Sequence, residues 1–422
     1  MRKSQLVSLL QVALSLLLLI ATGKFASPAS AATLKVDDDG AQCGATAYTT
    51  IQAAVDAASS GDRISICPGT YAEKVTVDKS LKFHGKAPDW KTCNTLGALD
   101  PTLHSIIDAP AVAGLNGIGL DLFADKVSIQ HLVIRQAGEV AIRTDPLYSG
   151  FSLKKTILVG NANGLYLHSS GVMPSSVKLN CFRQNPQAGI RTRYGLANVS
   201  MSENLFFQND NAAVIIDQEV GVTNSTLKLE RNKSQNDGTF AVVLGTADSR
   251  VRHNEIADTT GTAIFVGGNN VDLEISKNQI TNAGTRGIRF NTAAFGGNAN
   301  TGVWVMGNLV TGAGRHGIVA DSGAGESTLI NSIIEKNVVT NSGTGIDGGD
   351  GIRLEDPTLT GSNGGNTIRK NNISGSFHHD CHDGTAGTGT AGSANTWDTS
   401  NTAATQNLAN LCFTGAANGV AE

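Results

Sequence analysis

The chain has 422 residues, of which 49 are glycine, 9 are proline and only 5% are aromatic, and its formal net charge at pH 7 is −4. This charge argues against the basic surface that nucleic-acid binding requires, so we expect no nucleic acid among its partners. The length is large for one ordinary globular core but normal for a solenoid, whose core grows only along its axis.

Residues 1–31 have the features of a signal peptide. Arg2 and Lys3 precede an apolar segment, and small residues around Ala31 supply a cleavage site. The uninterrupted apolar part is too short to span a bilayer comfortably, which favours cleavage over a retained anchor. We expect a protein that is secreted or displayed at the cell surface, without stable membrane insertion.

Residues 50–59 are expected to form a helix that covers the first coil of the fold. Thr49 and Gln52 have the spacing of a capping box. One apolar helical face follows at Ile51, Ala54, Val55 and Ala58.

A six-residue pattern of apolar, polar, polar, Asn, any and apolar residues recurs along the chain. It is clear in MSENLF at 201–206, VRHNEI at 251–256 and ISKNQI at 275–280. The residues in the Asn position are Leu132, Thr156, Asn180, Asn204, Asn232, Asn254, Asn278, Asn308, Asn337 and Asn371. Their separations are 24, 24, 24, 28, 22, 24, 30, 29 and 34 residues, which indicates one coil with insertions at its turns.

Each repeat contains a second apolar strand, which often opens with Gly or Ala, as in GLYL at 164–167 and GIRF at 287–290. Side chains four residues before the Asn position are mostly polar, the alternation typical of strands buried on one face. The leucine-rich-repeat consensus is missing. We therefore predict an all-β fold, a single-stranded right-handed parallel β-helix of about 12 coils over residues 32–383, with the Asn residues stacked as an internal ladder.

The cysteines and the C-terminal segment complete the predicted architecture. Cys43 and Cys67 bracket the N-terminal helix, and Cys381 and Cys412 bracket the C-terminal tail, so we expect one disulfide at each end. The sequence leaves open whether Cys93 and Cys181 pair. Residues 384–422 are rich in Gly, Thr and Asn and are interpreted as a C-terminal cap or tail.

Residues 48–77, YTTIQAAVDAASSGDRISICPGTYAEKVTV, resemble the opening of many pectin-lyase-like β-helix proteins, including pectin methylesterases and maturation proteins of the NosD type. The resemblance implies a capping helix, a first coil at PGTY, and carbohydrate chemistry as the commonest use of the fold. The DFIFG and LGRPW stretches of the methylesterases are missing, as are the paired-aspartate and RIK motifs of polygalacturonases. The copies here look closest to generic secreted β-helix proteins, a group with no single chemistry.

Aligning the coils on the Asn position predicts two outward columns on the second strand. One holds Asp145, His168, Arg193, Asp217, Gly245, Gly267, Asn291, Asp321 and Glu355, and its neighbour holds Arg143, Tyr166, Arg191, Ile215, Val243, Phe265, Arg289, Val319 and Arg353. Adjacent coils lie about 4.8 Å apart, so these side chains come within contact range.

The first four coils would place Arg143, Asp145, Tyr166, His168, Arg191, Arg193 and Asp217 on one exposed strip. Arginine forks bind carboxylates, and His168 or Tyr166 can remove the proton alpha to a neutralised uronate. We assign Tyr166, His168 and Arg193 as catalytic candidates and the others as substrate-binding residues. The alternative is a solvated face of cross-strand ion pairs.

A second cluster holds Arg289, Asp321, Arg353 and Glu355, which we also assign to substrate binding, with His316 nearby. Trp304 occupies an outward position and can stack on a sugar ring, or else pack under the insertion at 291–301. The segment from His378 to Asp383 contains potential metal ligands. A disulfide at Cys381 and an ordinary polar turn account for it equally well, and we assign no metal and no cofactor.

These features predict a secreted β-helix protein that engages extracellular or cell-wall polysaccharide, acidic in character, along one sheet face. If it is an enzyme, a uronate lyase or epimerase is favoured over a hydrolase. The alternative is a non-enzymatic surface, adhesive or envelope structural protein. We expect a monomer.

Overall fold

The computed structural model describes residues 31–44, 48–109, 117–192, 195–217, 224–292, 299–321, 328–344, 348–355 and 363–419, and residues 33–422 form one compact unit. The predicted signal peptide and Arg193 lie outside the described residues. No helix within the described part of the chain is long and apolar enough to cross a membrane.

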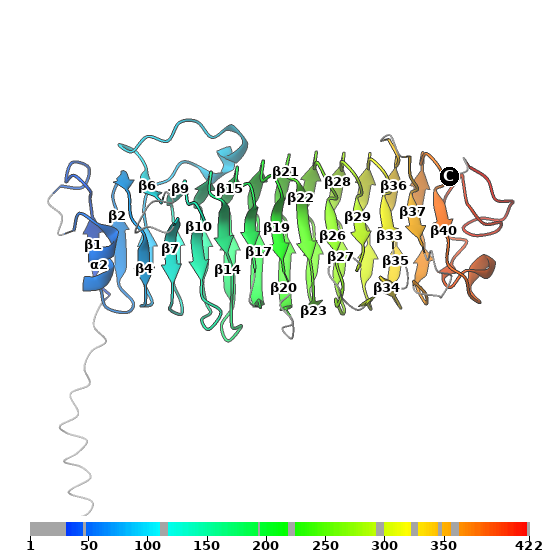
Figure 1. Cartoon of the computed structure of the whole chain (residues 1–422), viewed down its shortest axis with the longest axis horizontal. Helices are drawn as coiled ribbons and strands as arrows, with labels where there is room; N and C mark the ends of the chain where they lie inside the picture. Colours follow the sequence, from blue (N-terminus) through cyan, green and yellow to red (C-terminus); the bar gives the residue numbers. More distant parts are fainter. Residues whose placement is uncertain are drawn as a thin grey trace, which may run out of the picture. The chain divides into compact units, whose positions relative to one another are not determined.

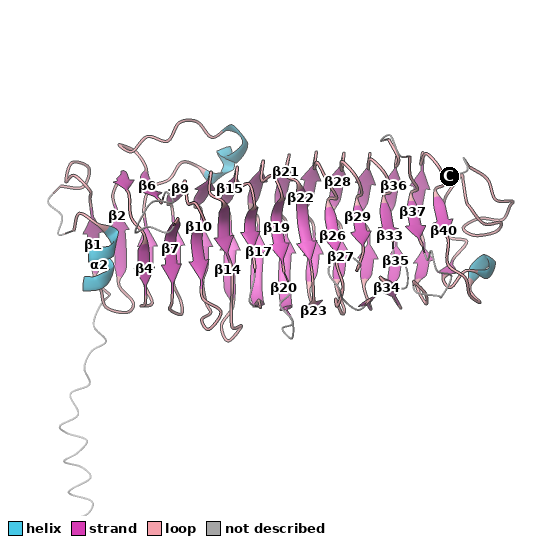
Figure 2. Cartoon of the chain, viewed as in Figure 1, coloured by secondary structure: helices cyan, strands magenta, loops and turns pink. Residues whose placement is uncertain are grey.

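The described residues wind into a parallel β-helix of about 12 coils, in which a full coil gives one strand to each of three sheets (Figures 1 and 2). Sheet A runs β1 (Thr33–Val36), β2 (Arg63–Ile66), β5 (Lys82–His84), β8 (Ser128–Gln130), β11 (Ser152–Lys154), β14 (Ser175–Lys178), β17 (Ala197–Ser202), β20 (Asn224–Glu230), β24 (Arg250–Arg252), β27 (Glu274–Ser276), β31 (Trp304–Met306), β35 (Ile333–Glu335), β38 (Thr367–Arg369) and β41 (Thr396–Trp397). Two short additions are β23 (Thr246–Ala247), which pairs with β20, and the pair β30 (Asn300–Thr301) and β34 (Leu329–Ile330).

Sheet B runs β3 (Gly69–Tyr71), β6 (Ser105–Asp108), β9 (Val133–Arg135), β12 (Ile157–Val159), β15 (Cys181–Arg183), β18 (Leu205–Phe207), β21 (Lys233–Gln235), β25 (Glu255–Ala257), β28 (Gln279–Thr281), β32 (Leu309–Thr311), β36 (Val338–Thr340) and β39 (Asn372–Ser374). Sheet C runs β4 (Val75–Val77), β7 (Ile118–Leu122), β10 (Val140–Thr144), β13 (Asn163–Tyr166), β16 (Ala188–Arg191), β19 (Ala212–Ile216), β22 (Thr239–Val243), β26 (Ile264–Val266), β29 (Ile288–Phe290), β33 (Ile318–Ala320), β37 (Ile352–Leu354) and β40 (Cys381–Asp383).

The six-residue pattern bends at its Asn, so its two halves belong to sheets A and B, and a coil has three strands instead of the two visible in the sequence. The residue before the Asn adopts a left-handed backbone, with φ of 55° at His253 and 53° at Lys277. The Asn side chains form the predicted ladder. In a typical rung, Asn254 accepts from the backbone N–H of Asn232 at 2.9 Å and donates to Asn278 at 2.9 Å. The ladder satisfies buried backbone groups at each turn, which makes its role structural.

A second ladder, which the sequence reading missed, stacks Asn161, Asn185, Asn209 and Asp237 at the turn between sheets B and C. The backbone N–H of each Asn donates to the side-chain oxygen of the next residue in the ladder. The last of these bonds runs from Asn209 to Asp237, at 2.7 Å. Burial, opposed by the hydrogen bonds from Ser234 and Asn209, raises the pKa of Asp237 to about 6.

The core runs through the interior of the coils and includes Phe182, Phe206 and Phe240, whose rings follow one another at 5.0 and 6.3 Å. The predicted outward column on sheet A is confirmed by strand pairing from coil to coil. Ser128 pairs with Ser152, Ser152 pairs with Ser176, and further along the sheet Glu274 pairs with Trp304.

The columns on sheet C need one correction. Ile215 pairs with Val242, not with Val243, and Val242 pairs with Phe265. The turn from β21 to β22 is one residue shorter than its neighbours, so Val243 is buried and Leu244 replaces Gly245 in the second column.

The N-terminal helix α2 (Ile51–Ala57) buries Ile51, Ala54 and Val55. The predicted capping box is wrong by one residue. The cap is Thr50, whose side chain accepts from the N–H of Ala53, and the Gln52 side chain reaches Asp56 instead. The carboxylate of Glu73 accepts from the backbone N–H groups of Ile51 and Gln52, the first two residues of the helix, at 2.8 and 2.9 Å.

Both predicted disulfides, Cys43–Cys67 and Cys381–Cys412, are present, and Cys93–Cys181 is a third. The third bond ties the insertion that contains the 3-10 helix η1 (Trp90–Thr95) to strand β15, and Figure 1 shows this insertion arching over the adjoining coils. At the other end, residues 384–419 add β41 and the 3-10 helix η2 (Thr390–Gly392) and bury Trp397, Leu411 and Cys412.

Candidate functional site

The predicted strip lies on sheet C between β7 and β19, where we name the described residues Asp121, Arg143, Asp145, Tyr166, His168, Arg191 and Asp217 the strip. Its arginines are paired with acids of neighbouring coils. Arg143 donates from Nε and Nη2 to Asp121 at 2.9 and 2.7 Å, and Arg191 donates to Asp217 at 3.1 Å. The geometry is that of cross-strand ion pairs, the alternative left open by the sequence.

Two catalytic candidates on the strip are buried, which corrects the prediction of an exposed pair. Tyr166 and His168 are each 3% exposed. The Tyr166 ring packs with Ile118 and Val140, and its hydroxyl accepts from Asn163 at 3.0 Å. Nδ1 of His168 lies 2.6 Å from the backbone carbonyl of Thr144, so this nitrogen donates. Both side chains are therefore engaged within the protein, Tyr166 with neighbouring side chains and His168 with a backbone carbonyl.

A cleft of about 520 Å³ opens instead beside β29, β33 and β37, where the second predicted cluster lies. We name it the arginine cleft. Its lining residues are Arg286, Arg315, His316, Asp321, Arg353, Glu355 and His378. Of these, Asp321, Arg353 and Glu355 were predicted to bind substrate. Arg286 and Arg315 were not predicted, and His378 was named only among potential metal ligands.

One of the residues that were not predicted, Arg286, belongs to a regular column that can be located from the sequence. Strand pairing extends the Arg289 column from Arg353 to His382. Three residues before successive members of this column lie Arg286, His316, Asp350 and His379, which stack at the turn that enters sheet C. The stacking is visible in the backbone bonds from Gly287 to the carbonyl of His316 and from Gly317 to that of Asp350. Arg286 and His316 of this turn column line the arginine cleft, whereas Asp350 and His379 are buried and are not among its lining residues.

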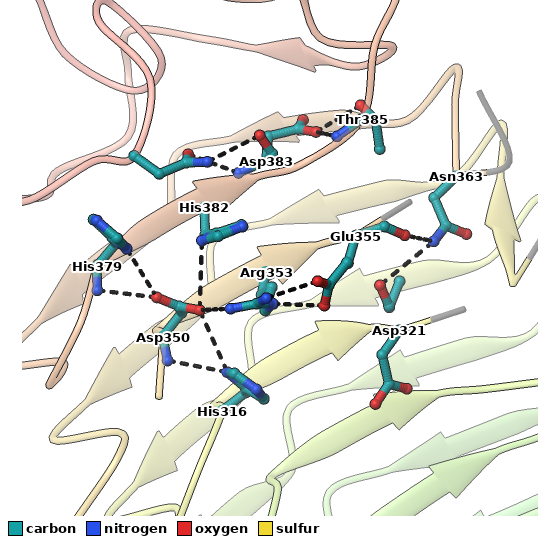
Figure 3. Close-up of polar contacts among 12 residues, drawn as sticks. His316, Asp321, Asp350, Arg353, Glu355, Asn363, His379, His382, Asp383 and Thr385 are labelled. Carbon is teal, nitrogen blue, oxygen red and sulfur yellow. Dashed lines mark hydrogen bonds and ion pairs between the residues drawn. The ribbon is translucent and has the colours of Figure 1, made fainter. Parts of the chain in front are cut away.

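Asp350 is the centre of the polar contacts at this turn and is completely buried (Figure 3). Arg353 donates to its Oδ2 at 2.7 Å. His379 donates to Oδ1 from its backbone N–H at 3.0 Å, and its Nδ1 lies 3.3 Å from the same oxygen. Nδ1 of His382 lies 3.7 Å from Oδ2. A buried carboxylate therefore faces one guanidinium and the ring nitrogens of two histidines.

His316 is held as a neutral ring in one tautomer. Its Nδ1 accepts from the backbone N–H of Asp350 at 3.0 Å, so it cannot also donate to the Asp350 carboxylate 3.5 Å away. Burial first, and then the positive charges of Arg353 and Arg286, lower the pKa of His316 to about 3. The ring proton therefore sits on Nε2, and His316 serves as a hydrogen-bond donor in the wall of the cleft.

The two acidic residues of the cleft are both held by arginines. Arg353 donates to both oxygens of Glu355 at 2.8 Å. Although burial opposes its charge, the hydrogen bonds and charges of Glu355 and Asp350 raise the pKa of Arg353 overall. Asp321 accepts from Nε of Arg289 at 2.9 and 3.0 Å and lies 3.4 Å from Arg286. Neither carboxylate is available alone, as a glycosidase acid would be.

The predicted ligand-rich segment divides into two groups. Asp380 and Asp383 make structural bonds, Asp380 to the N–H groups of Ser376 and Ala404 and Asp383 to the indole of Trp397 at 2.6 Å. His379 and His382 face Asp350, as described. Burial and then the charge of Arg353 lower the pKa of His382 to about 3.

Trp304 lies apart from both regions, on sheet A. Its side chain is 55% exposed, paired with Glu274 and Ile333 on the neighbouring strands. Most of the insertion under which it could otherwise pack, residues 293–298, lies outside the described residues, and both sugar binding and packing stay predictions.

Comparison with known proteins identifies the family. A family model described as a right-handed β-helix region matches residues 147–300 and 217–359, which together are just over half of the chain. The chain belongs to the right-handed β-helix family. The membership confirms the predicted right-handed β-helix fold, and the matched residues begin at 147, beyond the segment 48–77 on which the resemblance to pectin-lyase-like proteins rests. No curated protein matches the chain.

Solved structures of other β-helix proteins are similar in fold. A mannuronic-acid-specific polysaccharide family 6 lyase from human gut microbiota is 11% identical, with a TM-score of 0.52 over 81% of each chain. A family 6 alginate lyase in complex with a trisaccharide is 14% identical, with a TM-score of 0.51 over 76% of this chain and 81% of the other. The catalytic unit of an α-1,3-glucanase from Streptomyces thermodiastaticus is 14% identical, with a TM-score of 0.51 over 89% and 68%. At these identities the likeness is one of fold.

Proposed function

We propose that this β-helix protein binds an acidic polysaccharide across sheet C, with the anionic group of one sugar held in the arginine cleft. The observation that carries the proposal is the excess of positive charge there. Arg286, Arg289, Arg315 and Arg353 lie in or beside the cleft together with the carboxylates of Asp321, Asp350 and Glu355, while the whole chain has a net charge of −4.

Arg315 contributes most of this excess positive charge. Among the described residues it forms no ion pair, and its Nε has no hydrogen-bond partner. Asp321 is shared between Arg286 and Arg289, so its one negative charge does not neutralise both. A carboxylate of a bound sugar would supply the missing acceptor for these guanidinium groups.

The cleft also offers the neutral hydrogen bonds that sugars need. His316 presents Nε2–H, and Glu355 and Asp321 keep lone pairs for hydroxyl groups beyond their arginine contacts. Two of the structures similar in fold are lyases of acidic polysaccharides, which makes alginate and pectate the first ligands to test.

Binding is tested by affinity electrophoresis and calorimetry with alginate, polygalacturonate and a neutral glucan. We expect retention by the acidic polymers only, weakening as salt is added. Arg315→Gln should lower the affinity about tenfold, which corresponds to about 1.4 kcal/mol. The control Arg231→Gln, at a half-exposed arginine of another face, should change it less than twofold. Loss of binding in Arg191→Gln with full binding in Arg315→Gln would move the site to the strip.

A second candidate function, β-elimination at the same cleft, is favoured by His378, an imidazole beside the arginines. Arginines neutralise the uronate carboxylate, and His378 takes the proton alpha to it. The electron pair of that C–H bond forms a carbon–carbon double bond, the bond to the leaving sugar oxygen breaks, and water protonates that oxygen. Ultraviolet absorbance of the unsaturated product, lost in His378→Ala, would establish it. Proton exchange at the same carbon without new absorbance would indicate epimerisation.

Export belongs to the same proposal. Three disulfides are typical of proteins that mature in an oxidising compartment, and the N-terminal residues have the pattern of a signal peptide. N-terminal sequencing of the protein recovered from culture medium should begin near Ala32. Recovery of the full-length chain in the cytoplasm alone would contradict export.

A further inference from the structure

Next to the arginine cleft, three buried side chains converge from two consecutive coils. Asp350 lies in the turn before β37. His379 lies just before β40, and His382 lies in that strand. Their exposures are 0%, 9% and 9%. One potential ligand atom from each lies within 4.8 Å of the other two. Figure 3 shows both imidazoles turned toward the Asp350 carboxylate.

We propose that Asp350, His379 and His382 bind one divalent transition-metal ion of the zinc or copper type. The inference stands apart from glycan binding, because it concerns the buried side of the turn column and not the open cleft. Binding would join the last strand of sheet C to the coil before it.

The separations between the groups fit an ion placed among them. Nδ1 of His379 lies 3.3 Å from Oδ1 of Asp350, and Nδ1 of His382 lies 3.7 Å from Oδ2. Ligand atoms of a tetrahedral zinc site, with bonds of about 2.0–2.1 Å, lie about 3.3–3.5 Å apart. One carboxylate oxygen and one ring nitrogen of each histidine already lie within 4.8 Å of one another, and movement of the His382 ring toward Oδ1 would complete the geometry.

The chemistry of the groups selects the class of metal. Two imidazole nitrogens and one carboxylate suit zinc and copper, whereas calcium and magnesium require a shell made almost wholly of oxygen. His316 is excluded as a ligand, because its Nδ1 already accepts the backbone N–H of Asp350.

The positive charge of Arg353 does not prevent binding. Its guanidinium contacts Oδ2 of Asp350, yet it is also held by both oxygens of Glu355. The formal charge of Asp350, Arg353 and Glu355 together is −1, so a divalent ion brings the group to only +1. Oδ1 of Asp350 remains as a ligand atom when Arg353 keeps Oδ2.

The surroundings already orient the proposed ligands. The backbone N–H of His379 donates to Oδ1 of Asp350, which limits rotation of the carboxylate. Cys381, between the two histidines, is bonded to Cys412, and Gly419 lies so close to the His379 ring that an added Cβ would be 2.7 Å from it. Such supporting contacts fix metal ligands in place.

The test uses the full, disulfide-bonded secreted chain, freed of metal by a chelator and dialysed. Zinc chloride and copper sulfate are titrated separately by calorimetry, and thermal unfolding is followed with and without each ion. We expect one ion per chain and a higher unfolding midpoint with metal. His379→Ala and His382→Ala should each weaken binding at least about tenfold, by about 1.4 kcal/mol or more. His104→Ala, at a histidine of the N-terminal insertion, should leave it unchanged.

Wild-type protein decides the question even if a variant fails to fold. No stoichiometric binding of either ion by the wild type would overturn the proposal. So would one-to-one binding that persists in the folded His379→Ala/His382→Ala double variant. Cobalt substitution gives an independent readout, since visible absorption of a low-symmetry site should appear in the wild type and vanish in the double variant.

Discussion

The strip and the arginine cleft use the same sheet and similar residues, yet only the cleft has the properties of a site. On the strip, Arg143 and Arg191 each find an acid in a neighbouring coil, and Tyr166 and His168 are buried against the backbone. In the cleft, acids are shared, Arg315 has no ion pair among the described residues, and a cavity of about 520 Å³ is open.

The difference originates in the turns. Coils at the strip have 24 residues, or 28 in the coil that holds Asp217, whereas those at the cleft have 30, 29 and 34. The turn column in the cleft carries Arg286, His316, Asp350 and His379, while the residues at the equivalent positions of the strip are uncharged: Val140, Asn163, Ala188 and Ala212. A β-helix sheet by itself is a flat surface, and charged residues at the turn that enters sheet C line a cleft beside it.

The largest difference is expected when the buried carboxylate of each region is neutralised. Asp350→Asn removes the buried negative charge that Arg353 faces at 2.7 Å and leaves that guanidinium charge less compensated, so we expect a loss of about 3–5 kcal/mol in unfolding free energy. Asp121→Asn should cost less, about 1–2 kcal/mol, because Arg143 is 34% exposed and is hydrated when unpaired. Denaturant midpoints measured with chelator present give both values. Equal costs would mean that the two regions do not differ in this respect.

Lowering the pH should destabilise the coils of the β-helix at the arginine cleft before it destabilises those at the strip. The pKa values of His316 and His382 fall from 6.5 to about 3 on folding, so both rings stay neutral in the fold but take up protons in the unfolded chain below pH 6.5. Their contribution is intact above pH 6.5 and is lost progressively as pH falls toward 3. We expect a loss of about 2–3 kcal/mol between about pH 7.5 and 5.5.

Hydrogen exchange locates this loss. Amides of β33, β37 and β40 should exchange faster at the lower pH, after correction for intrinsic rates, while those of β10, β13 and β16 keep their protection. The His316→Gln/His382→Gln variant should flatten the pH dependence. Uniform loosening along the whole solenoid would contradict the assignment to these two rings.

The fold was predictable because the Asn positions repeat with a structural cause. Each ladder Asn satisfies backbone groups of the neighbouring coil, so it recurs wherever the chain turns from sheet A to sheet B. The outward column on sheet A followed from this register without error. On sheet C one turn shorter by a residue displaced Val243 and Gly245 from the predicted columns, since side chains alternate between faces.

The site was only partly predictable, for a different reason. Asp321, Arg353 and Glu355 lie on strands whose register the sequence reveals. Arg315 and His378 lie in turns, where the register gives no direction to a side chain. The burial of Tyr166 and His168 depends on how their rings turn onto the previous coil, which neither composition nor spacing encodes. The pairing of Cys93 with Cys181 joins an insertion to a distant strand and is likewise set by three-dimensional contact.

Asp237 lies between the two regions and should respond to pH in the opposite sense. Burial raises its pKa to about 6 at the end of the second ladder, where Asn would provide the same acceptor without charge. Its raised pKa means that stability is intact below about pH 4 and is lost as pH rises through 6. Asp237→Asn should therefore stabilise the protein by about 1–2 kcal/mol at pH 8 and by little at pH 4. A stabilisation independent of pH would show that charge is not the cause.

The smallest expected effect is a difference in coupling energy between one ion pair of the arginine cleft and one ion pair of the strip. Nε of Arg289 contacts both oxygens of Asp321, which Asn291 also orients at 3.0 Å, whereas Arg191 makes one contact with Asp217 at 3.1 Å. Double-mutant cycles with Arg→Gln and Asp→Asn changes should give a coupling of about 1–2 kcal/mol for the first pair and about 0.2–1 kcal/mol for the second. Added salt should reduce the second more, because its acid is more exposed, 30% against 17%. If both couplings were equal and equally sensitive to salt, the cleft arginines would be ordinary surface charges, and the case for a bound anion would rest on Arg315 alone.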